Sequence, residues 1–235
     1  MRLIKFINEG INDKGIFKAV FLAGTPGSGK SYVVGKIKSG QIEPRIVNTD
    51  KFFTLFDKED WNNYWDKISD RVKIVNIDQL ALYINSMLPL AIDGTSSSTS
   101  RIMRRKGILE SFGYDTAMVF VNTSLETALE RASKRTRQVD PDFIRQTYER
   151  MKHVKKFYKG LFNNFNEVNN DKGELTEKVI VDSFKKMKRF YDSPLNNPVG
   201  SRYVQEMKEN GWKYLDPHIT DIKYIKKVLG IWYNT

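Results

Sequence analysis

Short apolar runs alternate with longer, partly polar stretches over the first two thirds of the chain. The first run, residues 17–22, is apolar on both faces, which is typical of a strand buried in a parallel sheet. The other expected strands occupy residues 45–48, 88–92, 117–121 and 165–169. The stretches between them have helical patterns, and strands that alternate with helices predict a parallel sheet covered on both sides. We therefore expect a three-layer α/β fold with a central parallel sheet of about five strands.

The last quarter of the chain has only helical patterns. These cover residues 175–191, 201–209 and 219–229. Pro194 and Pro198 mark residues 193–200 as a linker between two of them. We expect a first domain over residues 1–173 and a basic helical C-terminal extension over residues 174–235.

The final helical pattern is amphipathic. The apolar face contains Ile219, Ile222, Ile225 and Leu229, and the basic positions are Lys223, Lys226 and Lys227. An apolar face of this kind usually packs against the body of the protein. The alternative is a basic clamp that binds nucleic acid, and the sequence leaves both interpretations open.

A glycine-rich turn directly follows the first strand and precedes a helix. It matches the full P-loop pattern G-x-x-x-x-G-K-[ST] with Gly24, Thr25, Pro26, Gly27, Ser28, Gly29, Lys30 and Ser31. Glycines let several backbone N–H groups point at phosphate oxygens, and the helix adds its positive N-terminal end. We expect Lys30 to reach the β- and γ-phosphates of ATP and the Ser31 hydroxyl to bind Mg²⁺.

Two aspartates directly follow apolar strands. Asp50 comes after the second strand and Asp93 after the third. Ligands of parallel sheets bind beyond the carboxyl ends of the strands, so both carboxylates should face the same cleft as the P-loop. We expect Asp93 to bind Mg²⁺ and Asp50 to accept a proton from an attacking hydroxyl. The alternative is that either carboxylate caps a helix or a turn.

A basic cluster follows the fourth strand at a helix end and in the loop after it. The cluster contains Arg131, Lys134, Arg135 and Arg137, with no acidic residue among them. Phosphoryl transfer spreads negative charge over the equatorial oxygens, which a closing arginine can neutralise. We expect a lid in which Arg131 and Arg135 act in catalysis and Arg137 contacts the nucleotide. The alternative is a solvated basic helix end that interacts with the helix dipole.

Composition adds a limited amount to this picture. The 235 residues carry a formal net charge of +11, which favours anionic partners such as nucleic acid or nucleotides. Cysteine is absent, so disulfides and thiolate metal sites are excluded. We see no signal peptide and no bilayer-spanning segment, and therefore expect a cytoplasmic protein without membrane contact. No obligate protein partner is evident.

The motifs together resemble a known kinase family. Gly24 to Ser31, Asn48-Thr49-Asp50, Ile92-Asp93-Gly94-Thr95 and the stretch from Leu129 to Arg135 are similar to the kinase domain of bacteriophage polynucleotide kinases and to the related zeta-toxin-like kinases. The likeness covers about residues 16–170. It implies an adenylate-kinase-like fold with a lid, a general base at Asp50, lid arginines at Arg131 or Arg135, and a phage origin.

The same resemblance shows two departures. In polynucleotide kinases the residue three positions beyond the base is an arginine that contacts the acceptor, and here it is Phe53. The tail also lacks the Asp-x-Asp-x-Thr run of the phosphatase domain that accompanies some of these kinases. The first departure leaves the acceptor open.

Three functions are compatible with these motifs and this charge. The first is a kinase that phosphorylates a nucleic-acid hydroxyl, either a polynucleotide 5′-hydroxyl or a hydroxylated base in DNA. Arg101, Arg104 and Arg105 would then follow the acceptor backbone, and Phe52 and Phe53 would stack a base. The second is a zeta-toxin-like kinase of a nucleotide-activated sugar. The third is a nucleotide-gated module that binds nucleic acid without turnover.

Overall fold

The protein forms one five-stranded parallel sheet with helices on both faces. The computed structural model describes residues 14–37, 43–53, 56, 58–134, 139–171, 177–211 and 217–233. The strands are β1 (Lys18–Ala23), β2 (Arg45–Val47), β3 (Leu90–Ile92), β4 (Asp115–Asn122) and β5 (Asn164–Asn169). Their order is β2-β3-β1-β4-β5, and every neighbouring pair is parallel. The predicted three-layer α/β fold is confirmed.

Side-chain alternation along β1 divides the interior into two cores. Phe21 and Ala23 belong to one core, whereas Val20 and Leu22 belong to the other, and all four are fully buried. Successive side chains of a strand point to opposite faces, so a strand between two helical layers must be apolar throughout.

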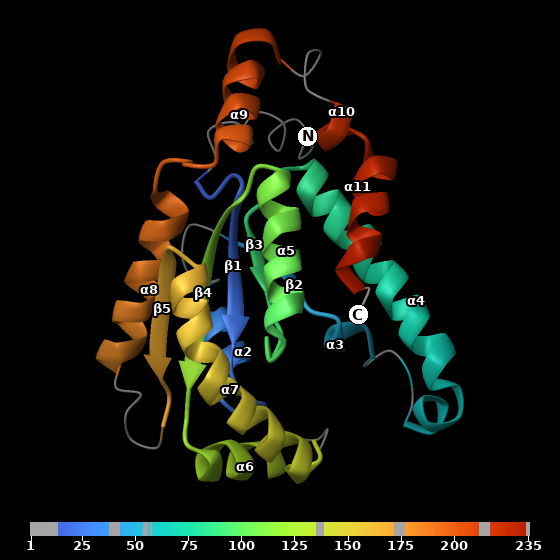
Figure 1. The fold of residues 1–235 in the computed structure, drawn as a ribbon, viewed down its shortest axis with the longest axis vertical. Coiled ribbons are helices and arrows are strands. Elements are labelled where there is room, and N and C mark those ends of the chain that lie inside the picture. Colours follow the sequence, from blue (N-terminus) through green and yellow to red (C-terminus); the bar gives the residue numbers. More distant parts are fainter. Residues whose placement is uncertain are drawn as a thin grey trace, which may run out of the picture.

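Two groups of helices cover these cores. The first core receives side chains from α4 (Lys58–Asn85), α5 (Thr99–Ser111), α7 (Pro141–Leu161), α9 (Pro198–Asn210) and α11 (Ile222–Leu229). The second receives them from α2 (Lys30–Ile37) and α8 (Glu177–Asp192). Shorter elements are α3 (Asp50–Phe53), α6 (Leu125–Ser133), α10 (Pro217–Thr220) and the 3₁₀ turn η2 (Gly230–Tyr233). Figure 1 shows α8 beside β5 on one flank and α11 alongside α4 on the other.

Two stretches with helical patterns are interrupted. The stretch between the second and third strands forms α3 and α4 separately, and α4 bends at Tyr64, whose φ of −133° and ψ of 27° are not helical. The pattern over residues 219–229 divides into α10 and α11. Asp221 causes this division because its carboxylate accepts the backbone N–H of Lys223 and starts a new helix.

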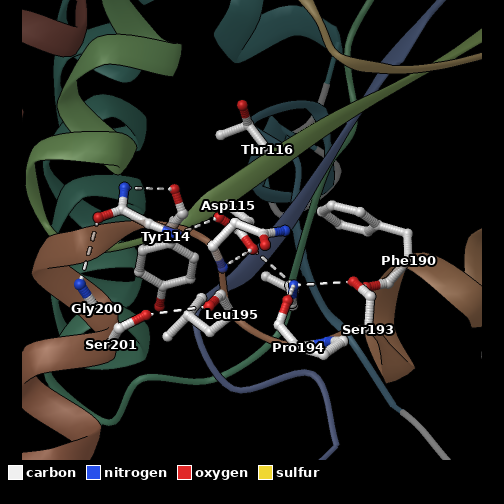
Figure 2. A network of polar contacts seen from close by, with 12 residues as sticks. Tyr114, Asp115, Thr116, Phe190, Ser193, Pro194, Leu195, Gly200 and Ser201 are labelled. Carbon is white, nitrogen blue, oxygen red and sulfur yellow. Dashed lines mark hydrogen bonds and ion pairs between the residues drawn. The ribbon is translucent and has the colours of Figure 1, made fainter.

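The expected linker is anchored to the sheet. Lys18 at the start of β1 is 2% exposed and donates to Asp115 at 2.7 Å, Ser193 at 3.1 Å and the Pro194 carbonyl at 2.9 Å. Figure 2 shows this network around Asp115. A buried cation is stable only when it is paired and hydrogen-bonded, so the connection after α8 is fixed at the amino ends of β1 and β4.

The same carboxylate also organises the start of α9. Asp115 accepts the backbone N–H groups of Asn196 at 2.9 Å and Asn197 at 2.8 Å. The Asn197 side chain then caps α9 by accepting the backbone N–H of Val199 at 2.9 Å. Pro198 lies in the first turn of α9. Proline is favourable there because its missing N–H would have no partner within the helix.

The C-terminal helices pack against the body of the protein. Ile219, Ile225 and Leu229 are fully buried and belong to the same core as Phe21. Of the two interpretations of the last amphipathic pattern, the packed helix describes the observed structure. Residues on both sides of position 173 share each core, and the domain boundary at that position stays a prediction.

Candidate active site

The candidate residues gather at one edge of the sheet. All five strands are parallel, so their carboxyl ends meet at the same edge. The P-loop follows β1, Asp93 follows β3, and Asn48 to Asp50 follow β2. Since β2, β3 and β1 are consecutive in the sheet, the three segments lie side by side. This is the edge at which open α/β sheets bind ligands.

The P-loop needs its glycines because of close contacts as well as backbone conformation. Gly27 and Gly29 have φ values of +88° and +89°, which other residues rarely adopt. A Cβ atom on Gly27 would lie 2.2 Å from the carbonyl oxygen of Ala128, and one on Gly29 would lie 2.1 Å from Nδ2 of Asn170. The loop is therefore pressed against α6 and against the segment that follows β5.

Lys30 folds back over the P-loop. Its Nζ donates to the carbonyl oxygens of Gly24 at 2.7 Å and Thr25 at 3.0 Å. Thr25, Pro26 and Ser28 of the same loop are buried. The ammonium group thus lies at the mouth of the loop, close to the backbone that would surround phosphate oxygens.

Asn48 connects the Asp93 carboxylate to the backbone of Asp50. Its Nδ2 donates to Oδ2 of Asp93 at 2.8 Å, and its Oδ1 accepts the backbone N–H of Asp50 at 2.8 Å. The backbone N–H of Asp93 also donates to the Val47 carbonyl at 2.9 Å. Asp93 is half-buried and held by these bonds, whereas Asp50 is exposed at the start of α3.

The segment after Asp93 is tied to the P-loop strand. The backbone N–H of Gly24 donates to the Thr95 carbonyl at 3.2 Å, and the Ser96 hydroxyl donates to the Leu22 carbonyl at 2.7 Å. Tyr158 of α7 donates to the Ser96 carbonyl at 2.6 Å. These bonds fix the position of Asp93 relative to the phosphate-binding loop.

Arg131 lies beside the P-loop in the last turn of α6. Its Nη1 donates to the Asn170 carbonyl at 2.7 Å and lies 4.0 Å from the position of a Cβ atom on Gly29. Asn170 in turn donates from Nδ2 to the Ser28 carbonyl at 2.5 Å. The other two arginines of the predicted lid, Arg135 and Arg137, lie outside the described residues.

The C-terminal end of the chain reaches the segment that carries Asp50. The Tyr233 hydroxyl donates to Oδ1 of buried Asn76 and lies 3.4 Å from Oγ1 of Thr49. A phenol has one proton, so Thr49 is the donor in the second bond. Burial raises the pKa of Tyr233, which keeps this phenol neutral at physiological pH.

Sequence reasoning missed several of these residues. Asn170 follows β5 directly, as Asp50 and Asp93 follow their strands, and the same rule about strand ends would have found it. Tyr233 and Asn76 carry no local signal, because their contact with Thr49 joins segments that are distant in sequence.

One of the two phenylalanines that follow Asp50 packs in a small apolar cluster. Phe52 is partly buried and packs against Ile68 and Val72 of α4 in a small separate cluster. Its contacts are therefore those of a core residue. The side chain of Phe53 lies outside the described residues.

The arrangement fits a nucleotide with Mg²⁺. No three His, Cys, Asp or Glu side chains of the described ranges group closely enough to hold a metal ion by themselves. Mg²⁺ in phosphoryl-transfer sites is bound by one or two protein groups together with phosphates and water, so a larger cluster is not required. The exposed Ser31 hydroxyl and the oriented Asp93 carboxylate have the oxygen donors that this ion prefers.

Comparisons with known proteins agree with this geometry. The AAA_33 family model, described as an AAA domain, matches residues 20–157. A protein provisionally described as a kinase from Chloroflexus aurantiacus has a similar structure, with a TM-score of 0.55, 13% identity, and coverage of 74% of this chain and 98% of that one. At this level of identity the likeness shows a shared fold. No curated protein matches the sequence significantly.

Two further solved structures are less similar. A gluconokinase from Sinorhizobium meliloti has a TM-score of 0.49 and 15% identity, and covers 75% of this chain and 95% of its own. A structure of the PezAT toxin–antitoxin system of Streptococcus pneumoniae has a TM-score of 0.45 and 17% identity, and covers 100% of this chain and 94% of its own.

None of the helices in the described part of the chain is both long and apolar enough to cross a membrane.

Proposed function

Because this chain belongs to the AAA_33 family and is a P-loop phosphotransferase, we propose that it transfers the γ-phosphoryl group of ATP to a hydroxyl of a nucleic acid. The observation that carries the proposal is the pair of bonds made by Asn48. They hold the Asp93 carboxylate and the backbone of Asp50 at the carboxyl ends of β3 and β2, which lie on one side of the strand that leads into the P-loop. A donor site and an acceptor site at one sheet edge are what phosphoryl transfer requires.

The P-loop side would bind the donor. Backbone N–H groups of the loop face the phosphates, and Lys30 moves from the Gly24 and Thr25 carbonyls to the β- and γ-phosphate oxygens. Ser31 and Asp93 would hold Mg²⁺, which when bound neutralises charge on those phosphates. Asn48 keeps the Asp93 carboxylate in one orientation for this purpose.

Asp50 would act as the general base. Its exposed carboxylate accepts the proton of the acceptor hydroxyl as the hydroxyl oxygen forms a bond to the γ-phosphorus. The bond from that phosphorus to the β,γ-bridging oxygen breaks, and ADP leaves with the electron pair. The products are ADP, the phosphorylated acceptor and the proton on Asp50.

Arginines would stabilise the charge of the transferred group. Arg131 lies beside Gly29, within reach of the loop that binds the phosphates. In the proposed mechanism Arg131 and Arg135 neutralise the equatorial oxygens, and Arg137 contacts the nucleotide.

The choice of a nucleic-acid acceptor is supported by charge. The chain has a net charge of +11, and Arg101, Arg104 and Arg105 lie in the first two turns of α5, which begins just after the Asp93 segment. Phosphate backbones bind such surfaces through electrostatic attraction. The first choice is a polynucleotide 5′-hydroxyl, and a hydroxylated base in DNA is the variant.

A second candidate acceptor is a nucleotide-activated sugar. It is favoured by the position of Phe52, which packs against α4 and so has its ring engaged in apolar contacts instead of offering a platform for a base. A small acceptor does not need such a platform.

The experiment that tests the function offers γ-labelled ATP with a panel of acceptors. The panel contains 5′-hydroxyl DNA and RNA, DNA with hydroxymethylated bases, and UDP-sugars. We expect label on a polynucleotide, with acceptor affinity that falls steeply as salt rises. Label on a UDP-sugar with little salt dependence would select the second candidate. Binding of nucleic acid with no labelled product would contradict the kinase assignment.

A further inference from the structure

Three arginines lie close together in the first two turns of α5. Arg101 is exposed, while Arg104 and Arg105 are half-buried. The Arg105 guanidinium lies 4.9 Å from the ring centre of Trp232 and 5.6 Å from that of Tyr233. The C-terminal turn η2 therefore supplies two aromatic rings that hold the side chain of Arg105 in a fixed position.

Arg105 is a desolvated cation without an acidic partner. No carboxylate of the described residues forms an ion pair with it, and its Nε atom is buried without a hydrogen-bond partner. Burial is the main reason why the pKa of Arg105 is lowered to about 10; Tyr233 opposes this shift, and the charges of Arg101 and Arg104 add to it. At a pKa of about 10 the group is still charged at neutral pH. Contact with two rings replaces only part of the hydration that a buried guanidinium loses.

Lys18 shows how the same fold treats a buried cation whose role is structural. Its ammonium group is paired with Asp115 at 2.7 Å and has two further acceptors, Ser193 and the Pro194 carbonyl. Arg105 has the burial and the aromatic contacts, but no residue in the described part of the chain supplies an anion to it. A bound anion would complete its environment.

The position of Arg105 indicates which anion this is. Tyr233, whose ring contacts Arg105, reaches the Thr49 hydroxyl with its own hydroxyl, and Thr49 precedes Asp50. The helix that carries Arg105 begins at Thr99, directly after the segment that contains Asp93. Arg105 therefore belongs to the side of the site where the acceptor would meet Asp50.

We propose that Arg105, held against Trp232 and Tyr233, binds a phosphate group that the acceptor already carries. A guanidinium presents planar paired donors that match two phosphate oxygens, and stacking on aromatic rings fixes the plane of those donors. The exposed Arg101 adds attraction for the same anion. The identity of the anion as an acceptor phosphate rests on the proposed function, whereas the anion site itself does not.

The test measures binding of inorganic phosphate to the full chain by calorimetry. Saturating Mg²⁺ and the non-hydrolysable analogue AMP-PNP first occupy the P-loop, so that phosphate can bind only elsewhere. We expect one further phosphate per chain, and Arg105→Gln should raise its Kd by about tenfold or more. Arg202→Gln is the matched control, because Arg202 also stacks on a tyrosine, Tyr203, but lies on α9, and its Kd should equal that of the wild type.

A second variant keeps the test decisive if Arg105→Gln does not fold. Arg105→Lys retains the charge but loses the planar pair of donors, and should raise the Kd by several-fold. Two results would overturn the proposal. One is that inorganic phosphate does not bind saturably to the AMP-PNP-loaded protein. The other is that both Arg105 variants and the wild type have equal Kd values for phosphate.

Failure of the subsite and failure of the proposed function are distinguishable. If the chain binds AMP-PNP and phosphorylates a phosphate-free hydroxyl, but no second phosphate binds, the subsite alone is wrong. If phosphate binds at Arg105 but no hydroxyl in the acceptor panel takes label from ATP, the anion site stands and the kinase assignment fails.

Discussion

The proposed donor side and the proposed acceptor side of the candidate site are built in different ways. The proposed donor side has one continuous segment at its centre, Gly24 to Ser31, whose shape follows from its own glycines and from the helix that begins at Lys30. The proposed acceptor side joins residues from four separate segments: Thr49, Asn76, Arg105 and Tyr233. A binding site formed by one continuous segment keeps its geometry in different proteins. A site formed by side chains from several segments changes whenever one of those segments changes.

This difference explains why the donor of the reaction can be assigned more sharply than the acceptor. A P-loop binds triphosphate through backbone groups, which every sequence of that pattern presents in the same way. An acceptor site depends on side chains that tertiary packing brings together. The variants below separate the two sides, and they are ordered by the size of the expected effect.

Lys30→Ala should have the largest effect. Loss of the ammonium group at the mouth of the P-loop removes a charge contact to the γ-phosphate, and we expect turnover to fall by about 10³-fold. Initial rates of label transfer from ATP measure this. Lys152→Ala is the matched control on the surface of α7 and should keep the wild-type rate. A Lys30→Ala enzyme with normal turnover would remove the P-loop from the reaction.

Asp50→Asn should lower turnover by about 10²-fold and leave nucleotide affinity unchanged. The substitution keeps the shape of the side chain but removes its ability to take the acceptor proton. Titration with a fluorescent ATP analogue measures the affinity, and the transfer assay measures the rate. Asp70→Asn on α4 is the control for loss of an exposed carboxylate. Weaker nucleotide binding with a normal rate would place Asp50 on the donor side instead.

Gly29→Ala should destabilise the protein by about 2 kcal/mol, because the new Cβ would collide with Asn170 and the φ of +89° is strained for alanine. Chemical denaturation measures the free energy of unfolding. Gly35→Ala in α2 has no atom within 4 Å of its Cβ and should be neutral or stabilising by up to about 1 kcal/mol. Equal stability of the two variants would contradict the close contact between the P-loop and Asn170.

Tyr233→Phe should have the smallest effect. It removes one hydroxyl that bonds Asn76 and Thr49, which corresponds to about 1 kcal/mol or roughly fivefold in turnover. Nucleotide affinity should be unchanged, because neither Asn76 nor Thr49 belongs to the P-loop. Steady-state kinetics with a titration of each substrate give the required values. A change in nucleotide affinity alone would show that the C-terminal turn serves the donor.

The sequence predicts most of the sheet because buried parallel strands have an unmistakable pattern. All five strands occur close to their expected positions. The breaks at Tyr64 and Asp221 were not predicted, since one helical period continues on both sides of each. The local sequence pattern indicates only that a segment has helical periodicity. Whether the helix breaks within that segment depends on how the residues on each side of the break pack against the rest of the protein.

The candidate site shows the same division. The positions of Lys30, Asp50 and Asp93 at one sheet edge follow from the rule that strand ends carry ligands. The bonds of Asn48 and the contact between Arg105 and Trp232 are side-chain events that no periodicity encodes. The prolines in residues 193–200 predict a linker. In the structure this segment is anchored, because the Asp115 carboxylate accepts backbone N–H groups from it.

The most direct test of the central claim is a crystal structure of the chain with Mg²⁺ and AMP-PNP. We predict that Lys30 leaves the carbonyl oxygens of Gly24 and Thr25 and contacts the terminal phosphate, and that the Asp50 carboxylate faces this phosphate across the acceptor space. A nucleotide bound elsewhere, with Lys30 still on those two carbonyl oxygens, would contradict the account. So would a terminal phosphate that points away from Asp50.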